Sequence, residues 1–337
     1  MKVLVTGGTG YVGSHTAVNL IEAGHDVVLW DNLSNSRAAV VERIGALVGT
    51  PPTFVQGDVR DAAGLDRLLE KQAFEAVIHF AGLKAVGESA QKPLLYYENN
   101  VQGTITLLRA LEKAGVRTFV FSSSATVYGD PACVPIREDF PRAATNAYGR
   151  SKIMIEDMLS DLVAADPRWR IARLRYFNPI GAHESGLLGE DPQDVPNNLV
   201  PYICRVAVGR EAVLRVFGAD YETPDGTGVR DYIHVRDLAL GHVAALRYLQ
   251  AHPGMLTVNL GTGHGYSVLE VVKAFGQACG RPIPYEIVAR RPGDVAQCYA
   301  DVSAARRLLG WQAVHDLDAM CGDAWRWQER NPQGYET

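Results

Sequence analysis

A tyrosine and a lysine stand four residues apart in the segment "NAYGRSK", which runs from Asn146 to Lys152. A phenol has an unperturbed pKa of about 10 and is a poor base at neutral pH. A neighbouring ammonium group stabilises the phenolate and lowers that pKa. Residues four apart on a helix share one face, so Tyr148 and Lys152 could equally be a half-buried ring beside a solvated amine. The rest of the chain has to decide between these interpretations.

A glycine-rich segment near the amino terminus, "TGGTGYVGSHT", places Gly7, Gly10 and Gly13 directly after an apolar run. Glycines at such positions allow a tight turn, a close approach of the backbone to a pyrophosphate and close helix–strand packing. The N–H groups that open the following helix favour an anion. Asp31 lies about twenty residues further on, where a carboxylate accepts hydrogen bonds from ribose hydroxyls. The pattern predicts a bound dinucleotide, and because Asp31 would repel a 2′-phosphate it favours NAD over NADP. The alternative for Asp31 is that it only begins the "DNLSNS" turn.

A run of three serines, Ser122 to Ser124, follows the apolar run 118–121. If that run is a parallel strand, the serines reach the same edge of the sheet as the glycine loop. Tyr148 could then take a proton from a sugar hydroxyl while hydride leaves the same carbon, with one serine hydroxyl bonded to that oxygen. Lowering the pKa of the phenol to near 7 needs roughly 4 kcal/mol. The Lys152 ammonium and a nicotinamide cation could supply that in a partly desolvated site. The combination favours catalysis over a plain helix face.

Apolar runs that alternate with longer amphipathic stretches predict the elements that position these residues. The runs are short and rich in valine, isoleucine and phenylalanine, as in buried parallel strands, and they cover 2–6, 26–30, 53–56, 76–80, 118–121 and 171–176. A seventh run, 256–260, is expected to rejoin the sheet, and "RPIPYEIV" and "GDVAQCYAD" are expected to be short strands outside it. The alternation predicts an α/β fold with a doubly wound parallel Rossmann sheet and a smaller C-terminal α/β substrate domain.

Composition narrows the class of protein. The chain has 337 residues, of which 47% are hydrophobic and 21% charged, as in an ordinary globular protein. A net charge of −5 without any basic run argues against a nucleic-acid partner. Five scattered cysteines without a C-x-x-C pair fit a reducing compartment and offer no metal-ligand spacing. No stretch approaches the roughly twenty apolar residues of a membrane span, and "MKVLVTGG" lacks the features of a signal peptide. We therefore expect a cytoplasmic protein without a metal.

Four segments, "VTGGTGYVGSHT", "SSSATVYGD", "YGRSK" and "VRDYIHVRDLA", resemble the extended short-chain dehydrogenase/reductase family. The longer segments "FAGLKAVGESAQKPLLYYENNVQGT", "RYFNPIGAHESGLLGEDP", "PNNLVPY" and "DGTGVRDYIHV" are similar to its members that epimerise UDP-hexoses at C4. The similarity covers essentially the whole chain. It implies reversible C4 epimerisation of UDP-glucose and UDP-galactose through a 4-keto intermediate, with tightly bound NAD as the transient hydride acceptor. It also implies a homodimer paired through two long helices, 93–114 and 147–165.

Residue by residue, the resemblance implies that Tyr148 is the base, Lys152 its electrostatic partner and Ser124 the serine that contacts the sugar oxygen. Together with the glycine pattern it implies NAD contacts from Gly7, Gly10, Tyr11, Val12, Gly13, Asp31, Asn32, Leu33, Ser34, Asn35, Ser36, Asp58, Val59, Phe80, Ala81, Gly82, Lys84, Asn99, Ser122, Tyr148, Lys152 and Phe177. It implies substrate contacts from Lys84, Ser124, Tyr148, Asn178, Asn198, Leu199, Arg230, Arg291, Asp294 and Cys298. A guanidinium binds a diphosphate with a planar fork, although surface ion pairs are the alternative for the two arginines. Asn99 is expected to begin or precede a helix, where it caps the helix or holds the cofactor region.

The change of pattern after about Tyr176, where glycine, proline and asparagine become frequent over 178–230, predicts a division into two domains. Residues 1–177, with a return near 231–261, are expected to bind NAD, and residues 178–230 and 262–337 to bind the UDP sugar. Cys298 falls where a residue borders the hexose pocket. Because cysteine is small, we expect some activity on UDP-N-acetylglucosamine and UDP-N-acetylgalactosamine as well, unless other residues close that pocket.

Three alternatives remain. A nucleotide-sugar 4,6-dehydratase needs a further acid–base pair, and the stretch after Ser124, Ala125 to Val127, carries no carboxylate. An epimerase of another UDP sugar would share the same motifs. A non-catalytic sensor that binds dinucleotide would typically lack the tyrosine–lysine pair.

Overall fold

A parallel sheet organises the structure, a computed structural model that describes residues 1–193, 196, 198–291 and 293–335. The sheet has seven strands in the order β11-β6-β5-β4-β1-β2-β3, and every neighbouring pair is parallel. Its strands are β1 (Lys2–Thr6), β2 (Asp26–Asp31), β3 (Thr53–Gln56), β4 (Ala76–His79), β5 (Thr118–Ser124), β6 (Arg170–Tyr176) and β11 (Gly254–Leu260). Each of the seven predicted apolar runs overlaps one of these strands, although β5 extends beyond its run to Ser124, and the run 256–260 rejoins the sheet beside β6 as expected.

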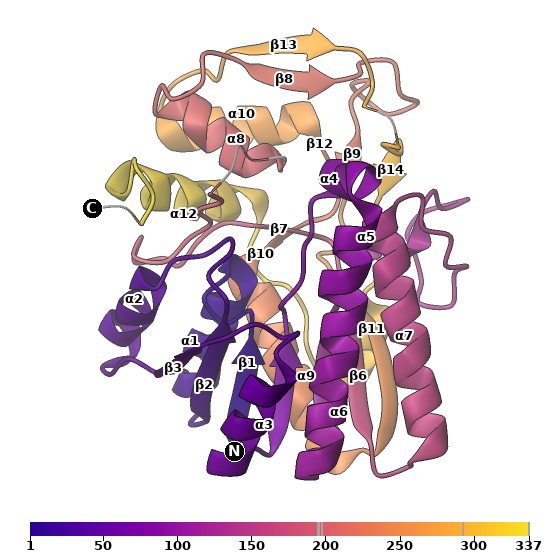
Figure 1. Cartoon of the computed structure of the whole chain (residues 1–337). Helices are drawn as coiled ribbons and strands as arrows, with labels where there is room; N and C mark the ends of the chain where they lie inside the picture. The colour runs from indigo at the N-terminus through magenta and orange to yellow at the C-terminus, as the bar shows by residue number, and fades with distance from the viewer. Residues whose placement is uncertain (194–195, 197, 292, 336–337) are drawn as a thin grey trace.

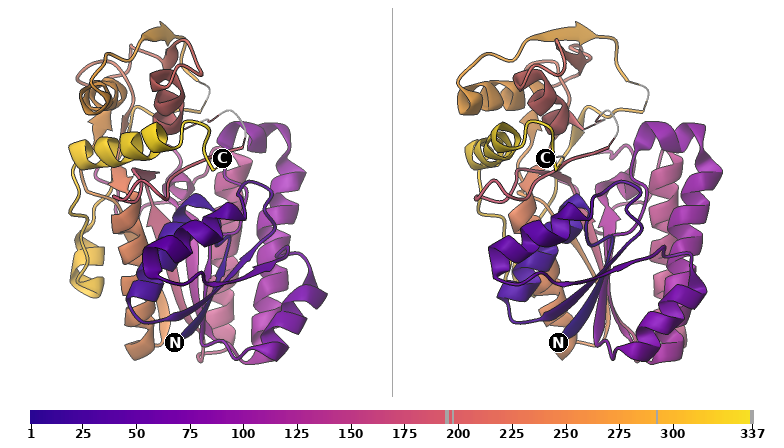
Figure 2. Two further views of the ribbon diagram at one scale, coloured as in Figure 1. Left: turned by 90° about the vertical axis from the view of Figure 1, so that its left-hand side faces the viewer. Right: turned by 60° about the vertical axis from the view of Figure 1, so that its left-hand side comes forward.

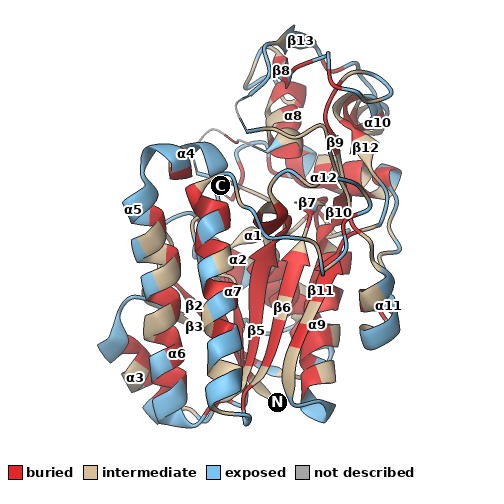
Figure 3. Ribbon diagram, turned by 90° about the vertical axis from the view of Figure 1, so that its right-hand side faces the viewer, coloured by how far each residue is buried: buried red, intermediate tan, exposed pale blue. Residues whose placement is uncertain are grey.

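Helices cover both faces of the sheet (Figures 1 and 2). The strands alternate their side chains between two apolar cores: in β1, Val3 and Val5 join one core, whereas Leu4 joins the other. The first core includes side chains of α1 (Tyr11–Glu22), α2 (Ala39–Val48) and α9 (Val235–Ala251); the second includes those of α3 (Ala62–Lys71), α6 (Gly103–Ala114) and α7 (Ala147–Ala165). The strands are buried between these layers (Figure 3). The predicted doubly wound Rossmann fold is confirmed.

A smaller α/β part lies beyond the carboxyl ends of the strands, at the top of Figure 1. Its core is formed by α8 (Leu199–Ala207), α10 (Val268–Cys279) and α12 (Leu317–Arg330), with β8 (Leu214–Phe217) paired to β13 (Tyr285–Val288). The predicted short strands in "RPIPYEIV" and "GDVAQCYAD" are β13 and β14 (Gln297–Cys298). The remaining elements are β7 (Asn178–Ile180), β9 (Val229–Arg230), β10 (Tyr232–His234), β12 (Tyr266–Ser267), α4 (Val86–Gln91), α5 (Pro93–Tyr96), α11 (Ser303–Leu309), the π-helix η1 (Tyr97–Gln102) and the 3₁₀-helix η2 (Ala125–Tyr128).

Asn99 departs from the expectation that it begins or precedes a helix. It lies inside η1, so the helical stretch 93–114 is continuous but changes from α to π and back to α. Such π-helical segments are rare and are frequently found at functional sites. None of the helices in the described ranges is both long and apolar enough to cross a lipid bilayer.

Candidate active site

Tyr148 and Lys152 lie on the first turns of α7, which begins beside the carboxyl edge of the sheet. The helix starts there because Asn146 caps it, its Oδ1 accepting from the Gly149 N–H at 2.8 Å. Both side chains are buried, with 6% and 5% of their surfaces exposed. The Lys152 ammonium donates to the Ser122 carbonyl at 2.8 Å and lies 5.8 Å from the centroid of the Tyr148 ring. Burial of this depth contradicts the interpretation of the pair as an exposed helix face.

The environment acts on the two side chains in opposite directions. Burial raises the pKa of Tyr148 above its ordinary value, and Tyr176 adds to this, whereas a hydrogen bond with Ser124 lowers it. Burial lowers the pKa of Lys152 to about 8, against the negative charge of Glu156, which raises it. The chain by itself therefore keeps Tyr148 protonated. Formation of the phenolate requires a second positive charge beside the ring, as the sequence argument supposed when it added a nicotinamide cation to Lys152.

The three serines belong to the last residues of β5 rather than following it, and each has a different partner. Ser122 supplies its carbonyl oxygen to Lys152, and Ser123 donates its hydroxyl to Glu156 at 2.7 Å. Ser124 Oγ accepts from the Thr126 N–H at 3.2 Å and from the Thr126 hydroxyl at 2.9 Å. The Ser124 hydroxyl is thus oriented by η2 while it remains beside Tyr148, a suitable position for a donor to a substrate oxygen.

The glycine loop has the close backbone contacts that a pyrophosphate cradle needs. Gly7 has a φ of +71°, and a Cβ there would lie 2.6 Å from the Ala81 nitrogen. A Cβ on Gly13 would lie 2.1 Å from the Gly7 carbonyl oxygen, so no side chain fits there. Gly10 is the N-cap of α1 and makes no side-chain cap, which leaves the first N–H groups of that helix available to an anion. Tyr11 and Val12 form the first turn, and the Tyr11 hydroxyl donates to the Gly181 carbonyl at 2.7 Å.

Asp31 ends β2 and organises the loop after it. Its carboxylate accepts from the Leu33 N–H at 2.9 Å and from the Ser36 hydroxyl at 3.1 Å. Leu33 has a φ of +60°, an uncommon conformation that this Asp31 contact helps to hold. Asn32 points away from Asp31 and donates to Asp58 at 2.9 Å. Ser34 and Asn35 are exposed. This loop fits the ribose of a dinucleotide whose pyrophosphate lies on the glycine loop.

Asp58 and its neighbour Val59 follow β3. Arg60 binds the Asp58 carboxylate with a planar fork at 2.9 Å, and this ion pair holds the pKa of the carboxyl well below its usual range. Val59 is buried. Asp58 therefore remains a charged acceptor at the sheet edge, where the resemblance implies a contact to NAD.

Phe80 to Lys84 run from the end of β4 along the same edge. The N–H groups of Phe80 and Ala81 donate to the Thr6 carbonyl, and Gly82 and Lys84 are exposed. Lys84 makes an ion pair with Glu190 at 3.0 Å. Phe177, by contrast, is 4% exposed and packs in an apolar cluster with Ala125 and Tyr128.

Asn100, which sequence reasoning missed, holds this loop in place. Its side chain accepts from the Leu83 N–H at 2.8 Å and donates to the Leu83 carbonyl at 3.0 Å and to the Ser151 hydroxyl at 3.2 Å. The side chain of Asn99 donates to Asn100 at 3.0 Å. The motif "YYENNVQGT" contains both asparagines, and only their place in η1 distinguishes their roles.

The predicted substrate residues lie mainly in the smaller part. Arg230 in β9 and Cys298 in β14 are register partners. Arg291 makes an ion pair with Asp294 at 3.0 Å, and its guanidinium lies 5.5 Å from the centroid of the Phe217 ring. Arg230, Arg291 and Asp294 all lie within electrostatic range of the Tyr232 hydroxyl, which brings these residues together.

Three further predicted substrate residues lie at element starts. Asn178 begins β7 and is exposed; Asn198 is the N-cap of α8 and Leu199 its first residue. Phe217 was not predicted. Its ring is 40% exposed next to Arg291, and this exposure is visible in the structure and not in the sequence.

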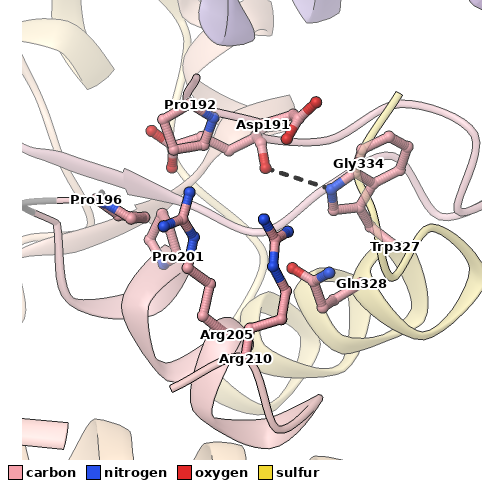
Figure 4. Close-up of a pocket in the computed structure, with 10 residues that line it drawn as sticks. Asp191, Pro192, Pro196, Pro201, Arg205, Arg210, Trp327, Gln328 and Gly334 are labelled. Carbon is pink, nitrogen blue, oxygen red and sulfur yellow. Dashed lines mark hydrogen bonds between the residues drawn. The ribbon is translucent and has the colours of Figure 1, made fainter. Parts of the chain in front are cut away.

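A small pocket away from Tyr148 lies between α8, α12 and the segment around Asp191. Figure 4 shows Arg205 and Arg210 extending from α8 and the residues after it toward this segment. Trp327 Nε1 donates to the Glu190 carbonyl at 3.3 Å. This bond ties α12 to the segment whose Glu190 side chain pairs with Lys84. No group of three or more potential metal ligands is found in the described part of the chain.

Comparison with known proteins agrees with this geometry. Residues 3–261 match the model of the NAD dependent epimerase/dehydratase family. A UDP-glucose 4-epimerase of Dictyostelium discoideum is 56% identical over 99% of this chain and 97% of its own length. The crystal structure of UDP-glucose 4-epimerase from Bifidobacterium longum in complex with NAD⁺ and UDP is 53% identical, with a TM-score of 0.97 over 99% of this chain and 100% of that one. That of the enzyme from Stenotrophomonas maltophila, with bound NAD and formylated UDP-arabinopyranose, is 52% identical, with a TM-score of 0.97 over 99% of both chains. The expected resemblance and the use of NAD are confirmed: this chain belongs to the NAD dependent epimerase/dehydratase family.

Proposed function

We propose that this protein interconverts UDP-glucose and UDP-galactose by epimerisation at C4 through a 4-keto intermediate. The observation that carries the proposal is the buried pair Tyr148 and Lys152, placed against Ser124 at the sheet edge that also bears the glycine loop. The full-length similarity to UDP-glucose 4-epimerases supports the same reaction.

Three side chains act on the C4 hydroxyl and its proton. Tyr148 takes the proton of the C4 hydroxyl and later returns it, because it is the titratable group that the Ser124 hydroxyl approaches. Lys152 keeps a positive charge beside the ring, fixed by its bond to the Ser122 carbonyl. Ser124 donates to the C4 oxygen, since its own acceptor positions already bind Thr126. The glycine loop and Asp31 would hold NAD, which would supply the transient acceptor for the C4 hydride.

Inversion at C4 requires that the protein bind the UDP part of the substrate tightly and the hexose part loosely. The UDP must stay bound while the hexose turns and presents its other face, so binding energy far from C4 retains the intermediate. We assign the binding of UDP to the second predicted domain, residues 178–230 and 262–337, in which Arg230 and Arg291 contact the diphosphate. The exposed Phe217 ring beside Arg291 offers a stacking surface for the uracil.

Cys298 is proposed to widen the hexose site enough for a 2-acetamido group. It is half-buried in β14 beside Arg230 and packs against the apolar cluster that contains Ala125 and Phe177. A small side chain at this wall supports turnover of UDP-N-acetylglucosamine in addition to UDP-glucose.

We further infer a homodimer in the cytoplasm. A mostly apolar groove runs along α5, η1, α6 and α7, where Leu94 is 80% and Met154 45% exposed, and its other lining residues are Tyr97, Glu98, Val101, Gln102 and Ile105. Such a patch is typical of a protein–protein contact. Leu107 and Leu111 of the same helix α6 are instead fully buried in the core of their own chain. All the cysteines are free thiols, which fits a reducing compartment.

The test is proton NMR of UDP-galactose mixed with the purified protein, first without and then with added NAD. Appearance of UDP-glucose without addition is the expected result and means that the cofactor is retained and recycled. Activity only with added NAD would keep the reaction but reject tight retention. If no product forms although NAD is bound, the reaction is wrong, and turnover of another UDP sugar or its absence then separates a different epimerase from a non-catalytic sensor.

A further inference from the structure

A buried glutamate, Glu156, lies directly behind the catalytic pair. Its side chain is fully buried and carries a negative charge, because Arg175 and Ser123 hold the pKa of the carboxyl below its usual range against the effect of burial. Arg175 binds it with a planar fork, Nε to Oε1 at 2.9 Å and Nη2 to Oε2 at 2.7 Å, and Ser123 donates to Oε1 at 2.7 Å. An isolated charge in such a place would be very unfavourable, so the Ser123 hydroxyl and the several arginines around the carboxylate are what allow Glu156 to remain ionised.

Arg175 extends this network to the segment that follows Ser124. Its Nη1 donates to the Tyr128 hydroxyl and to the Glu138 carbonyl, both at 2.9 Å. Tyr128 ends η2 and donates in turn to Asn259 in β11 at 2.7 Å. The network therefore ties α7, β5, β6, η2 and β11 together immediately below the catalytic residues.

Glu156 lies close in the fold to Lys152 and, through Ser123, to Ser124. It lies one helical turn after Lys152 on α7, at the spacing that puts two side chains on one face. Its partner Ser123 lies between Ser122, which receives the Lys152 ammonium, and Ser124. We propose that Glu156, held by Arg175, is a positioning residue for the epimerisation proposed above: it fixes the serines of β5 against α7 and supplies the negative charge that keeps Lys152 cationic.

The charges around these groups determine the direction of the effect. Lys152 faces Glu156 and Tyr148 on its own helix and His79 on β4, and His79 is neutral because burial lowers its pKa to about 3. Glu156 also faces Arg173 on β6 and Arg142, whose Nη1 lies 3.4 Å from it. Loss of the glutamate charge leaves Arg175 uncompensated and makes Lys152 release its proton at a lower pH. Loss of the Arg175 charge leaves Glu156 with less compensation and makes Lys152 release its proton at a higher pH. Arg173 and Arg142 keep Glu156 ionised in that variant.

The experiment compares kcat as a function of pH for four NAD-loaded proteins: wild type, Glu156→Gln, Arg175→Met and the double variant. On the alkaline side of this profile kcat falls as Lys152 loses its proton. In Glu156→Gln we expect this alkaline limb to shift to lower pH by about one unit. In Arg175→Met it moves up, and in the double variant it returns toward wild type. KM for the UDP sugar stays within about twofold, because neither residue is among the predicted substrate contacts. Arg168→Met, which removes an exposed arginine paired with Asp166, is the matched control and should leave the limb in place.

The outcomes distinguish a failure of the positioning role of Glu156 from a failure of the proposed function on which it rests. An inactive wild type rejects the proposed function. An active wild type whose variants are slower, with unmoved alkaline limbs, means that the network is only structural and overturns the inference. If Glu156→Gln does not fold, Arg175→Met decides alone: a shift of its alkaline limb to higher pH supports the inference, and an unmoved limb overturns it.

Discussion

The substitution Gly13→Ala tests the glycine loop with a single methyl group. A Cβ at residue 13 would lie 2.1 Å from the Gly7 carbonyl oxygen and 3.1 Å from the Gly8 Cα. Since such contacts are essentially never shorter than about 3 Å, the loop or the start of α1 must move by roughly 1 Å. Overpacking of this kind costs about 1–3 kcal/mol. Because the same atoms line the cradle for the pyrophosphate, we expect NAD to bind about 5–150-fold more weakly if that cost falls on the bound state.

The assay is calorimetric titration of NAD into stripped protein, with NAD content after purification as a second measure. Gly322→Ala is the matched control: Gly322 also lies inside a helix, α12, and a Cβ there meets nothing within 4 Å. It should bind NAD like wild type and be more stable by about 0.5–1 kcal/mol, since glycine is unfavourable inside helices. If Gly13→Ala binds NAD as tightly as the control, the close approach of the loop is not what forms the cofactor site.

Three further predictions concern the site itself. Tyr148→Phe should lower kcat by about 10²–10⁴-fold while NAD content is unchanged; loss of NAD would show instead that the site had collapsed. Lys152→Met should abolish turnover yet make the cofactor-free protein more stable at pH 7, by at most about 3 kcal/mol, because burial lowers the pKa of Lys152 from 10.5 to about 8. The charged form of Lys152 is disfavoured in the folded state, so the free energy of unfolding of the wild type rises with pH between about 8 and 10.5 relative to that of the variant. Denaturant unfolding that gives a constant difference between the two proteins across that range would contradict this. Cys298→Tyr should retain activity on UDP-glucose but lose that on UDP-N-acetylglucosamine, and equal exclusion of the acetamido sugar by wild type and variant would reject the role of Cys298.

The strands and the edge that carries the chemistry could be predicted because their signals are local. Each buried parallel strand is a short continuous apolar run, and the turn after β1 contains the glycines that its backbone requires. The N-terminal helix positions of Tyr148 and Lys152 follow from the polar cap at Asn146. The extension of β5 through Ser124 was less visible, because serines weaken the apolar pattern although they pair with β6 to the end of the strand.

Contacts between distant segments could not be predicted in this way. Glu156 and Arg175 read as ordinary charged residues of a helix and a strand, and only the fold shows that they are buried and paired. Asn100 and Asn99 are neighbours in one motif, and the π-helical turn decides which of them faces the loop of Leu83. The raised pKa of Tyr148 depends on burial that no spacing in the sequence reports.

The return of β11 to the sheet has a consequence for the synthesis of the chain. β6 needs β11 as its outer neighbour along its whole length, from Arg170 to Tyr176. While the ribosome has made only the residues before β11, the nascent sheet ends in β6 as an open edge, with unpaired backbone groups of the kind that recruit other chains. The sheet of the cofactor-binding half is therefore complete only after the segment that ends at Leu260 has emerged, and until then its β6 edge is open to pairing with other chains.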